Sequence, residues 1–417
     1  MKGTWKQLLD NHQFRWLFAG NTSLFFGFFA TMLLRALLVW DMTHDEMALA
    51  YINLATAICM LAVSLLSGVI IDRCERRRII LISQTVVLVA ESSIAVLLWL
   101  DSLTYEILLL SAVASSLAFP FIMPARTAMM VDTVGKRPLI KATALLSAGM
   151  NIARTLSPAF IGFLADWRGF VSCYIFLVGL HAISIVCTIF LDRHQPKTLP
   201  NADFFDEFLE GYRYLFRHTS LSMAIIFSVP PMLVVVSLQS LMVVFVDDIW
   251  NTSGSGLGIM MAAMGVGGII GSLLMTWIPD RKIVTPMISG TLCMAGFLIF
   301  FAHSSNFWLA TIMLLGVSSC SVISQTLTQS AVQLMSDDFI RGRVTTITLM
   351  TFSLSPIGTL PLAYIIKHFG AQWALTMAAI LLSLVVLLIG KSSPAFRRID
   401  DLSSMATEVQ TIPEMYK

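Results

Sequence analysis

Apolar residues in this chain gather into long runs that are separated by short polar segments. A helix that crosses a bilayer needs roughly 20 mainly apolar residues, and the runs reach that length. We therefore predict twelve transmembrane helices, near residues 16–39, 47–71, 79–100, 104–128, 142–165, 170–191, 220–246, 256–278, 284–303, 307–331, 343–366 and 372–391. The run at 104–128 is the least regular, because it contains Pro120 and Pro124.

The basic residues test this count independently. If the N-terminus is cytoplasmic and the spans alternate, most of the 27 Lys and Arg residues fall in cytoplasmic segments or at the adjoining helix ends. Arg168 and Lys367 fall on the outer side, and Arg35 and Arg154 fall within spans. An excess of positive charge on the cytoplasmic side is typical of membrane proteins. The pattern therefore indicates an even number of spans with both termini in the cytoplasm.

Tryptophans agree with this arrangement, because an amphipathic indole ring prefers the headgroup level of a bilayer. Those at or just beyond predicted span ends are Trp16, Trp40, Trp99, Trp167, Trp250, Trp277, Trp308 and Trp373. We expect them to lie at the two membrane interfaces.

Composition excludes several other classes of protein. Hydrophobic residues make up 57% of the 417 positions and charged residues 12%, about half the share in a soluble domain. Mean hydropathy is +0.80, and a net charge of +2 predicts no nucleic-acid partner. The six cysteines show neither paired nor metal-ligand spacing. We expect no metal site, no cofactor and no enzyme activity, and the polar N-terminus does not resemble a cleaved signal peptide.

The longest interior hydrophilic stretch divides six predicted spans from six. We expect an N-terminal six-helix half (1–191), a cytoplasmic linker (192–219), a C-terminal six-helix half (220–391) and a cytoplasmic tail (392–417). Within the linker, residues 203–217 have the apolar spacing of an amphipathic helix. That segment either lies along the inner membrane face or merely joins the halves.

The two halves also share a pattern of residues. Arg126-Thr-Ala is followed by Lys141 in the first half, and Gln329-Ser-Ala is followed by Arg343 in the second. Two repeated halves that enclose a site near the midplane are typical of secondary transporters. The sequence thus predicts an all-α membrane protein of twelve transmembrane helices, arranged as two six-helix bundles.

A specific motif lies between the second and third spans, where the chain reads GVIIDRCERRR from residue 68 to residue 78. This resembles the loop signature of the major facilitator superfamily, G-x-x-x-D-R-x-G-R-[KR]. The matching positions are Gly68, Asp72, Arg73, Arg76 and Arg77. Glu75 stands where the family usually has Gly, and the second half has only a degenerate copy at residues 280–282.

Three further stretches resemble the branch of macrolide-efflux-type and enterobactin-exporter-type members. They are F-x-x-P-A-R-x-A at residues 121–128, Asn151 with Arg154 in the fifth span, and Arg-Gly-Arg-Val at residues 341–344. The resemblance implies the major facilitator fold and transport by alternating access.

The loop has a physical interpretation. Gly68 and Asp72 are one helical turn apart and share a face, and a glycine allows a neighbouring helix to approach closely. Asp72 can then meet a basic side chain or a helix N-terminus. The resemblance implies that these residues form a latch between the halves on one side of the transport cycle. Alternatively, Arg76 to Arg78 only obey the topology rule.

Ionisable groups at membrane depth are costly, so they are functional candidates. Glu91 in the third span is either the carboxylate that couples transport to protons or part of a structural ion pair. Arg154 in the fifth span either attracts an anionic substrate or pairs with Glu91. Arg35 in the first span either reaches the outer headgroups or faces the cavity entrance.

Polar and aromatic faces supply candidates for the substrate cavity. Gln325 and Gln329 share one face of the tenth span with Gln333, and amides facing lipid would be expensive. This face either contacts substrate or bonds to other helices. The further cavity candidates are Gln239, Asn21, Phe25, Phe29 and Arg126.

We therefore predict a proton-coupled exporter of a small amphiphilic molecule, such as a drug or siderophore. We expect it to act as a monomer in the cytoplasmic (inner) membrane of a bacterium, with the lipid bilayer and protons as its other partners. An uptake symporter of the same fold is the first alternative, because the motifs do not specify direction. A membrane-embedded lipid-handling protein is the second, although no polar catalytic cluster at one membrane face supports it.

Overall fold

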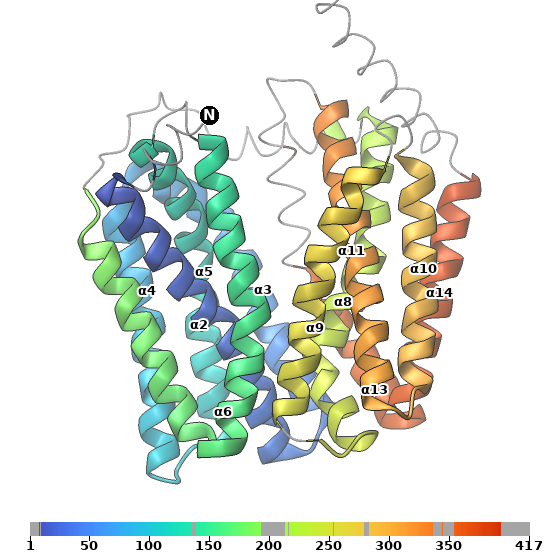
Figure 1. Cartoon of the computed structure of the whole chain (residues 1–417), viewed down its shortest axis with the longest axis horizontal. Coiled ribbons are helices and arrows are strands. Elements are labelled where there is room, and N and C mark those ends of the chain that lie inside the picture. The colour runs from blue at the N-terminus through green and yellow to red at the C-terminus, as the bar shows by residue number, and fades with distance from the viewer. Residues whose placement is uncertain are drawn as a thin grey trace, which may run out of the picture. The chain divides into compact units, whose positions relative to one another are not determined.

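The computed structural model describes residues 8, 10–134, 139–192, 213–215, 217–252, 254–278, 283–336, 344 and 354–392. Its described elements are all helical (Figure 1). They are α2 (His12–Thr43), α3 (Glu46–Arg73), α4 (Arg76–Trp99), α5 (Tyr105–Val134), α6 (Leu139–Ile189), α8 (Thr219–Asp248), α9 (Gly254–Leu274), η1 (Met275–Trp277), α10 (Val284–His303), α11 (Phe307–Met335), η2 (Ser355–Gly358), α13 (Thr359–Phe369) and α14 (Ala371–Ser392).

Ten of the helices in the described ranges are long and apolar enough to cross a membrane. One of them, α6, is 51 residues long and contains two predicted spans, which meet at Gly169. The backbone of Gly169 has φ = 76°, a conformation that glycine adopts without steric cost. The eleventh predicted span, 343–366, is represented by η2 and α13, and residues 343 and 345–353 of that span lie outside the described residues.

Polar residues fix where several helices begin. The side chains of Asn11, Asp45 and Asn306 accept hydrogen bonds from backbone N–H groups in the first turns of α2, α3 and α11. Such caps satisfy donors that have no partner within the helix. At the other boundary, Gly370 adopts φ = 85° and separates α13 from α14. The short polar segments of the sequence therefore contain the signals that start and stop the spans.

The helices form two compact units. One unit contains residues 1–200 and 242–262, and the other contains residues 201–241 and 263–417. In the first unit α2 packs mainly on α6, while α4 and α5 pack on each other. In the second unit α10 packs on α11 and α14.

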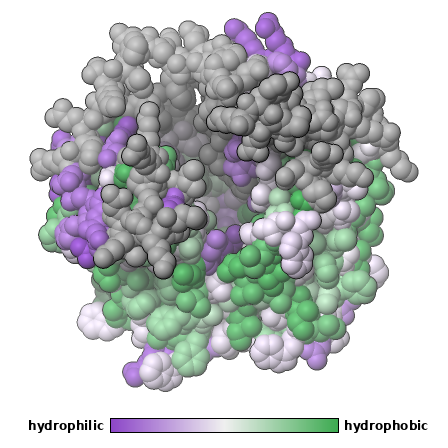
Figure 2. Space-filling model, turned by 45° about the horizontal axis from the view of Figure 1, so that its top comes forward, coloured by the Kyte–Doolittle hydropathy of each residue, from purple (hydrophilic) through white to green (hydrophobic). Residues whose placement is uncertain are grey.

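Apolar side chains cover the flanks of the helices, as the space-filling view shows (Figure 2). Many large ones are exposed in the absence of lipid, as expected for a surface that faces a bilayer. Exposed tryptophans lie at or near helix ends at Trp99, Trp167, Trp277, Trp308 and Trp373.

Trp40 differs from this interfacial pattern. It is only 8% exposed, and its indole N–H donates to Asp247 Oδ2 at 2.8 Å within the first unit. A buried indole needs such a partner for its N–H. Asp247 therefore explains why Trp40 is buried near the end of α2, and its place at the headgroup level stays a prediction.

In the second unit, α9 and α11 approach closely through small residues. A Cβ at Gly267 would lie 2.5 Å from the carbonyl oxygen of Leu315. The hydroxyls of Ser318 and Ser319 donate across this contact to the carbonyls of Met264 and Gly267, at 2.5 and 2.7 Å. Small residues and hydroxyl hydrogen bonds of this kind hold membrane helices together.

Replacing Gly267 with Ala is expected to destabilise the protein by about 1–3 kcal/mol, because the new methyl group overlaps backbone that cannot move away. Thermal unfolding of the purified variant measures the effect. Gly296→Ala in α10 is the matched control, since nothing lies within 4 Å of its Cβ position. Equal stability of the two variants would show that the contact between α9 and α11 is loose.

Candidate functional site

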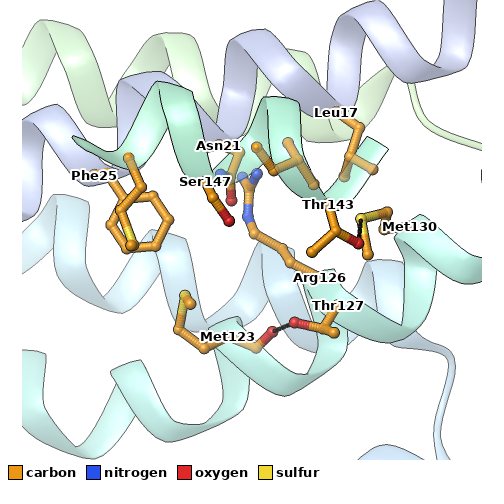
Figure 3. A pocket seen from close by; sticks show the side chains of 11 residues that line it. Leu17, Asn21, Phe25, Met123, Arg126, Thr127, Met130, Thr143 and Ser147 are labelled. Atoms are coloured by element: carbon orange, nitrogen blue, oxygen red, sulfur yellow. Dashed lines mark hydrogen bonds between the residues drawn. The ribbon is translucent and has the colours of Figure 1, made fainter. Parts of the chain in front are cut away.

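A cavity in the first unit is lined by α2, α5 and the first part of α6 (Figure 3). Its volume is about 140 Å³. Its lining residues are Leu17, Asn21, Phe25, Met123, Arg126, Thr127, Met130, Thr143, Leu146, Ser147 and Met150. Arg126 reaches across this cavity, and its guanidinium lies near Asn21 and Ser147 in the view of Figure 3. The sequence-predicted cavity residues Asn21, Phe25 and Arg126 are thus brought together.

Arg126 is buried, with an exposed fraction of 4%. Helix α5 continues to Val134, so Arg126 lies more than two turns inside its C-terminal end. The predicted span ends near residue 128, so the structure moves Arg126 from the end of a helix to its interior. The helix is longer than its apolar run, which places this cation within the protein.

Hydroxyl groups of α6 hold the guanidinium on one side. Arg126 Nη2 donates to Ser184 Oγ at 2.9 Å and to Thr188 Oγ1 at 3.2 Å. Gln84 of α4 joins the same network, because its amide donates to Ser184 and accepts from Thr188. Ser184 in turn donates to the carbonyl oxygen of Gly20 in α2. Four helices therefore fix one edge of the guanidinium.

Glycine at position 20 makes room for this arrangement. A Cβ there would lie 2.9 Å from the Cβ of Cys187 and 3.5 Å from both Nη1 and Nη2 of Arg126. Helix α2 can therefore pass close to α6 and to the guanidinium at the same level.

The other two nitrogens of the guanidinium have no partner among the described residues. Nε and Nη1 of Arg126 are both buried and make no hydrogen bond there. The neighbouring titratable group is the thiol of Cys187 rather than a carboxylate. A buried guanidinium with two unused donors and no counter-charge is an unusual and costly feature.

A second charged centre lies elsewhere in the first unit. Glu91 of α4 is 1% exposed, and its Oε1 lies 3.5 Å from Arg35 Nη2 of α2. The Ser115 hydroxyl of α5 donates to the same oxygen at 3.3 Å. Tyr174 of α6, also buried, interacts electrostatically with both charges. This carboxylate therefore sits in a paired, hydrogen-bonded environment.

The partner of Glu91 differs from the one considered in the sequence analysis. Glu91 pairs with Arg35, and no ion pair joins it to Arg154 among the described residues. Arg154 is half-buried in the first part of α6 and has no ion-pair partner in the described ranges. Whether Glu91 pairs with Arg35 or with Arg154 depends on which faces of α2, α4 and α6 contact each other. Hydropathy does not specify these contacts.

His181 is a buried residue that sequence reasoning missed. It is 3% exposed, and neither ring nitrogen has a hydrogen-bond partner among the described residues. A Cβ at Gly27 would lie 3.0–3.1 Å from its ring, so glycine there accommodates the imidazole. The spacing of His181, Ser184 and Thr188 along one face of span six was the signal that could have found this polar face.

The motif residues make contacts within the first unit. Arg76 pairs with Asp132 of α5, and Arg77 donates to the carbonyl oxygen of Ile189 at the C-terminal end of α6. A cation is favourable at a helix C-terminus. The structure describes the backbone of Gly68, Asp72 and Arg73 at the end of α3, but not their side-chain contacts or exposure. Their role as a latch stays a prediction.

The remaining candidates are dispersed. Gln325 donates to Ser321 Oγ of its own helix at 3.1 Å, and Gln329 is exposed on α11. Gln239 is half-buried in α8 of the second unit. Phe29 stacks on Phe25 with ring centroids 6.4 Å apart, but does not line the cavity. Their contact with substrate stays a prediction.

Comparisons with known proteins define the class. A peptide transporter of the POT family has a TM-score of 0.74 at 12% identity, and the match covers 93% of this chain and 95% of that one. The nucleoside transporter NupG also has a TM-score of 0.74 at 12% identity, with 90% and 98% coverage. The chain therefore has the fold of these transporters, which confirms the predicted all-α fold of twelve transmembrane helices in two six-helix bundles.

The family follows from the sequence itself. The family model described as "Transmembrane secretion effector" matches residues 3–415. The chain belongs to this family of the major facilitator superfamily. The superfamily predicted from residues 68–77 is confirmed.

Two curated relatives are more distant. Multidrug resistance protein 1 of Bacillus subtilis (strain 168) is 25% identical over 236 residues, which cover 56% of this chain and 57% of that protein. The match thus spans a little over half the length of this relative. The Staphyloferrin A transporter of Staphylococcus aureus (strain NCTC 8325 / PS 47) is 21% identical over 368 residues, or 85% and 90% of the two chains.

Arg35→Met is expected to destabilise the protein by about 3 kcal/mol, because it leaves the buried carboxylate of Glu91 without a counter-charge. Glu91→Gln should cost less, since a neutral amide can keep the hydrogen bond from Ser115. Denaturant unfolding of the purified variants measures both effects. The double variant Arg35→Met/Glu91→Leu should regain part of the loss. If Arg35→Met proves no less stable than Glu91→Gln, the ion pair is not a significant interaction.

Proposed function

We propose that this transporter is a proton-coupled exporter of a small amphiphilic molecule, a drug or siderophore, in the cytoplasmic membrane of a bacterium. The observation that carries the coupling is the environment of Glu91. Glu91 is the only buried Asp or Glu among the described residues. The names of the two curated relatives support a drug or siderophore as substrate.

Protonation of Glu91 would change the forces between three helices. The charged carboxylate attracts Arg35 of α2 and accepts a hydrogen bond from Ser115 of α5. A neutral carboxyl group loses the Coulomb attraction, which is strong in a medium of low dielectric. Proton uptake therefore releases Arg35, and proton loss recaptures it. A two-state charge contact of this kind is what coupling of transport to a proton gradient requires.

Alternating access would use two further elements. The motif residues Gly68 and Asp72 would latch one side of the cycle, as the resemblance of their loop implies. The cavity at Arg126 would contribute to the substrate site. We propose the monomer as the working unit.

The alternative is uptake by the same fold, and the solved structures of similar fold include a nucleoside transporter and a peptide transporter. A thermal-stabilisation screen against siderophores, macrolides and lysolipids would identify a substrate, which is then labelled for transport measurements. Accumulation in inverted vesicles, driven by a proton gradient acidic inside, is expected for an exporter. Accumulation only in right-side-out vesicles would identify an uptake symporter.

Glu91→Gln is expected to abolish the dependence of transport on the proton gradient, because an amide does not titrate. Downhill exchange of the same substrate should continue. Initial rates measured with and without the gradient separate the two activities. Glu106→Gln is the matched control, since this carboxylate is exposed at the start of α5. Wild-type gradient dependence in Glu91→Gln would exclude Glu91 as the coupling group.

The proposed orientation can be tested with a native cysteine. Cys74 is exposed between α3 and α4, on the side that we propose to be cytoplasmic. A charged, impermeant maleimide is expected to label it in inverted vesicles and not in intact cells. Cys293, the other exposed cysteine, lies within the apolar helix α10, and Cys74→Ser should remove the labelling. Labelling in intact cells would reverse the proposed orientation.

A further inference from the structure

Arg35, which is half-buried, and Arg126, which is buried, differ in how their charge is balanced. Arg35 has the carboxylate of Glu91 as a counter-ion. Arg126 has only neutral hydroxyl groups, from Ser184 and Thr188, as acceptors. Hydroxyls satisfy hydrogen bonds but do not neutralise a charge, and an uncompensated ion in an apolar medium is strongly unfavourable. The charge of Arg126 therefore needs an anion that the described residues do not supply.

The geometry of the guanidinium fits an incoming oxyanion. The hydroxyls of α6 bond to Nη2, whereas Nε and Nη1 remain unused. Nη1 carries two N–H groups that can donate charge-assisted hydrogen bonds to a carboxylate, whereas the Nε–H bond points to the opposite side of the planar group. Because Nη2 is already fixed by α6, little side-chain entropy remains to be lost on binding.

The cavity beside Arg126 indicates what else the ligand carries. Its volume of about 140 Å³ is below the roughly 300–1,000 Å³ of pockets that enclose a drug-sized ligand, so it holds a head group rather than a whole molecule. Asn21, Thr143 and Ser147 supply polar groups on the lining. Leu17, Phe25 and Met150 supply apolar ones. A short acidic head joined to an apolar body suits both kinds of surface.

We infer that the substrate is a carboxylate-bearing amphiphile, and that Arg126 binds its carboxylate through Nη1. This inference rests on the proposed transport function and specifies the substrate class. Asn21 of α2 lies on the same cavity and positions the head group opposite the guanidinium. Bound carboxylate would supply the counter-charge that the empty site lacks.

The probe pair is N-octanoylglycine and N-octanoylglycinamide, which differ only in whether the head is an acid or an amide. Binding to wild-type protein in phosphatidylcholine nanodiscs, measured by equilibrium dialysis, should favour the acid by at least about tenfold. Arg126→Met should remove this preference, and the amide should bind both proteins alike. Thr85→Ala, an uncharged change on the exposed face of α4 away from the cavity lining, should retain the preference.

A second variant protects the test against misfolding of Arg126→Met. Asn21→Asp places a carboxylate on the cavity that can pair with Arg126, so it should block the acid and leave the protein folded. Asn21→Leu should keep the preference for the acid, though with weaker binding. Full acid binding by Asn21→Asp would contradict the assignment.

An anionic lipid head group offers similar chemistry to a free acid. Nanodiscs containing phosphatidylglycerol distinguish the two sources. If that lipid stabilises the wild type but not Arg126→Met, and the acid no longer binds, the site takes a lipid phosphate and the inference is overturned. Equal binding of acid and amide by the wild type, including no binding of either, also overturns it. Because dialysis uses no gradient, failure of proton-driven export would leave this result intact.

Discussion

The cost of holding a charge away from water is the constraint on which the first unit depends. The half-buried Arg35 and the buried Arg126 satisfy that constraint in different ways. Arg35 is balanced by a carboxylate on α4, so the ion pair is complete within the protein. Arg126 donates to hydroxyl groups that also bond to the amide of Gln84. Some of its N–H donors are therefore satisfied, but no carboxylate among the described residues balances its charge. The ion pair of Arg35 with Glu91 can act as a switch, whereas the guanidinium of Arg126, which lacks a counter-charge among the described residues, can bind a ligand.

Helix α2 connects the two centres. It carries Arg35, and it also carries Gly20 and Asn21 beside Arg126. Fourteen residues separate Asn21 from Arg35, which corresponds to roughly 21 Å along a helix. In the proposed cycle, this helix would link the release of Arg35 to the position of the cavity wall. Coupling through one packed element needs no chain of contacts between distant residues.

Hydropathy and charge predicted much of the fold, because lipid imposes simple rules on helix length and loop charge. The helices from α2 to α14 lie close to the predicted spans, and Gly169 separates the fifth from the sixth. The motif beginning at Gly68 correctly predicted the superfamily. Lipid does not determine which helix faces meet, so the pairing of Glu91 with Arg35 was not predicted.

The candidate site was predictable only in part. Asn21, Phe25 and Arg126 were identified from residue type and resemblance, and the structure brings them to one cavity. The depth of Arg126 was missed, because α5 extends past the apolar run that marked its predicted end. Sequence reasoning missed Ser184, Thr188 and Gln84, because hydroxyl and amide side chains are common in spans. Their role can be recognised only when the structure shows what they contact.

Infrared difference spectroscopy of the reconstituted protein tests the central claim most directly, that Glu91 gains and loses a proton and thereby releases Arg35. A step to lower pH should produce the C=O band of a protonated carboxyl group in an apolar environment, together with a change in a guanidinium band. The carboxyl band should be missing in Glu91→Gln, and the guanidinium change should be missing in Arg35→Met. A carboxyl band that persists in Glu91→Gln, or no band in the wild type, would contradict the account.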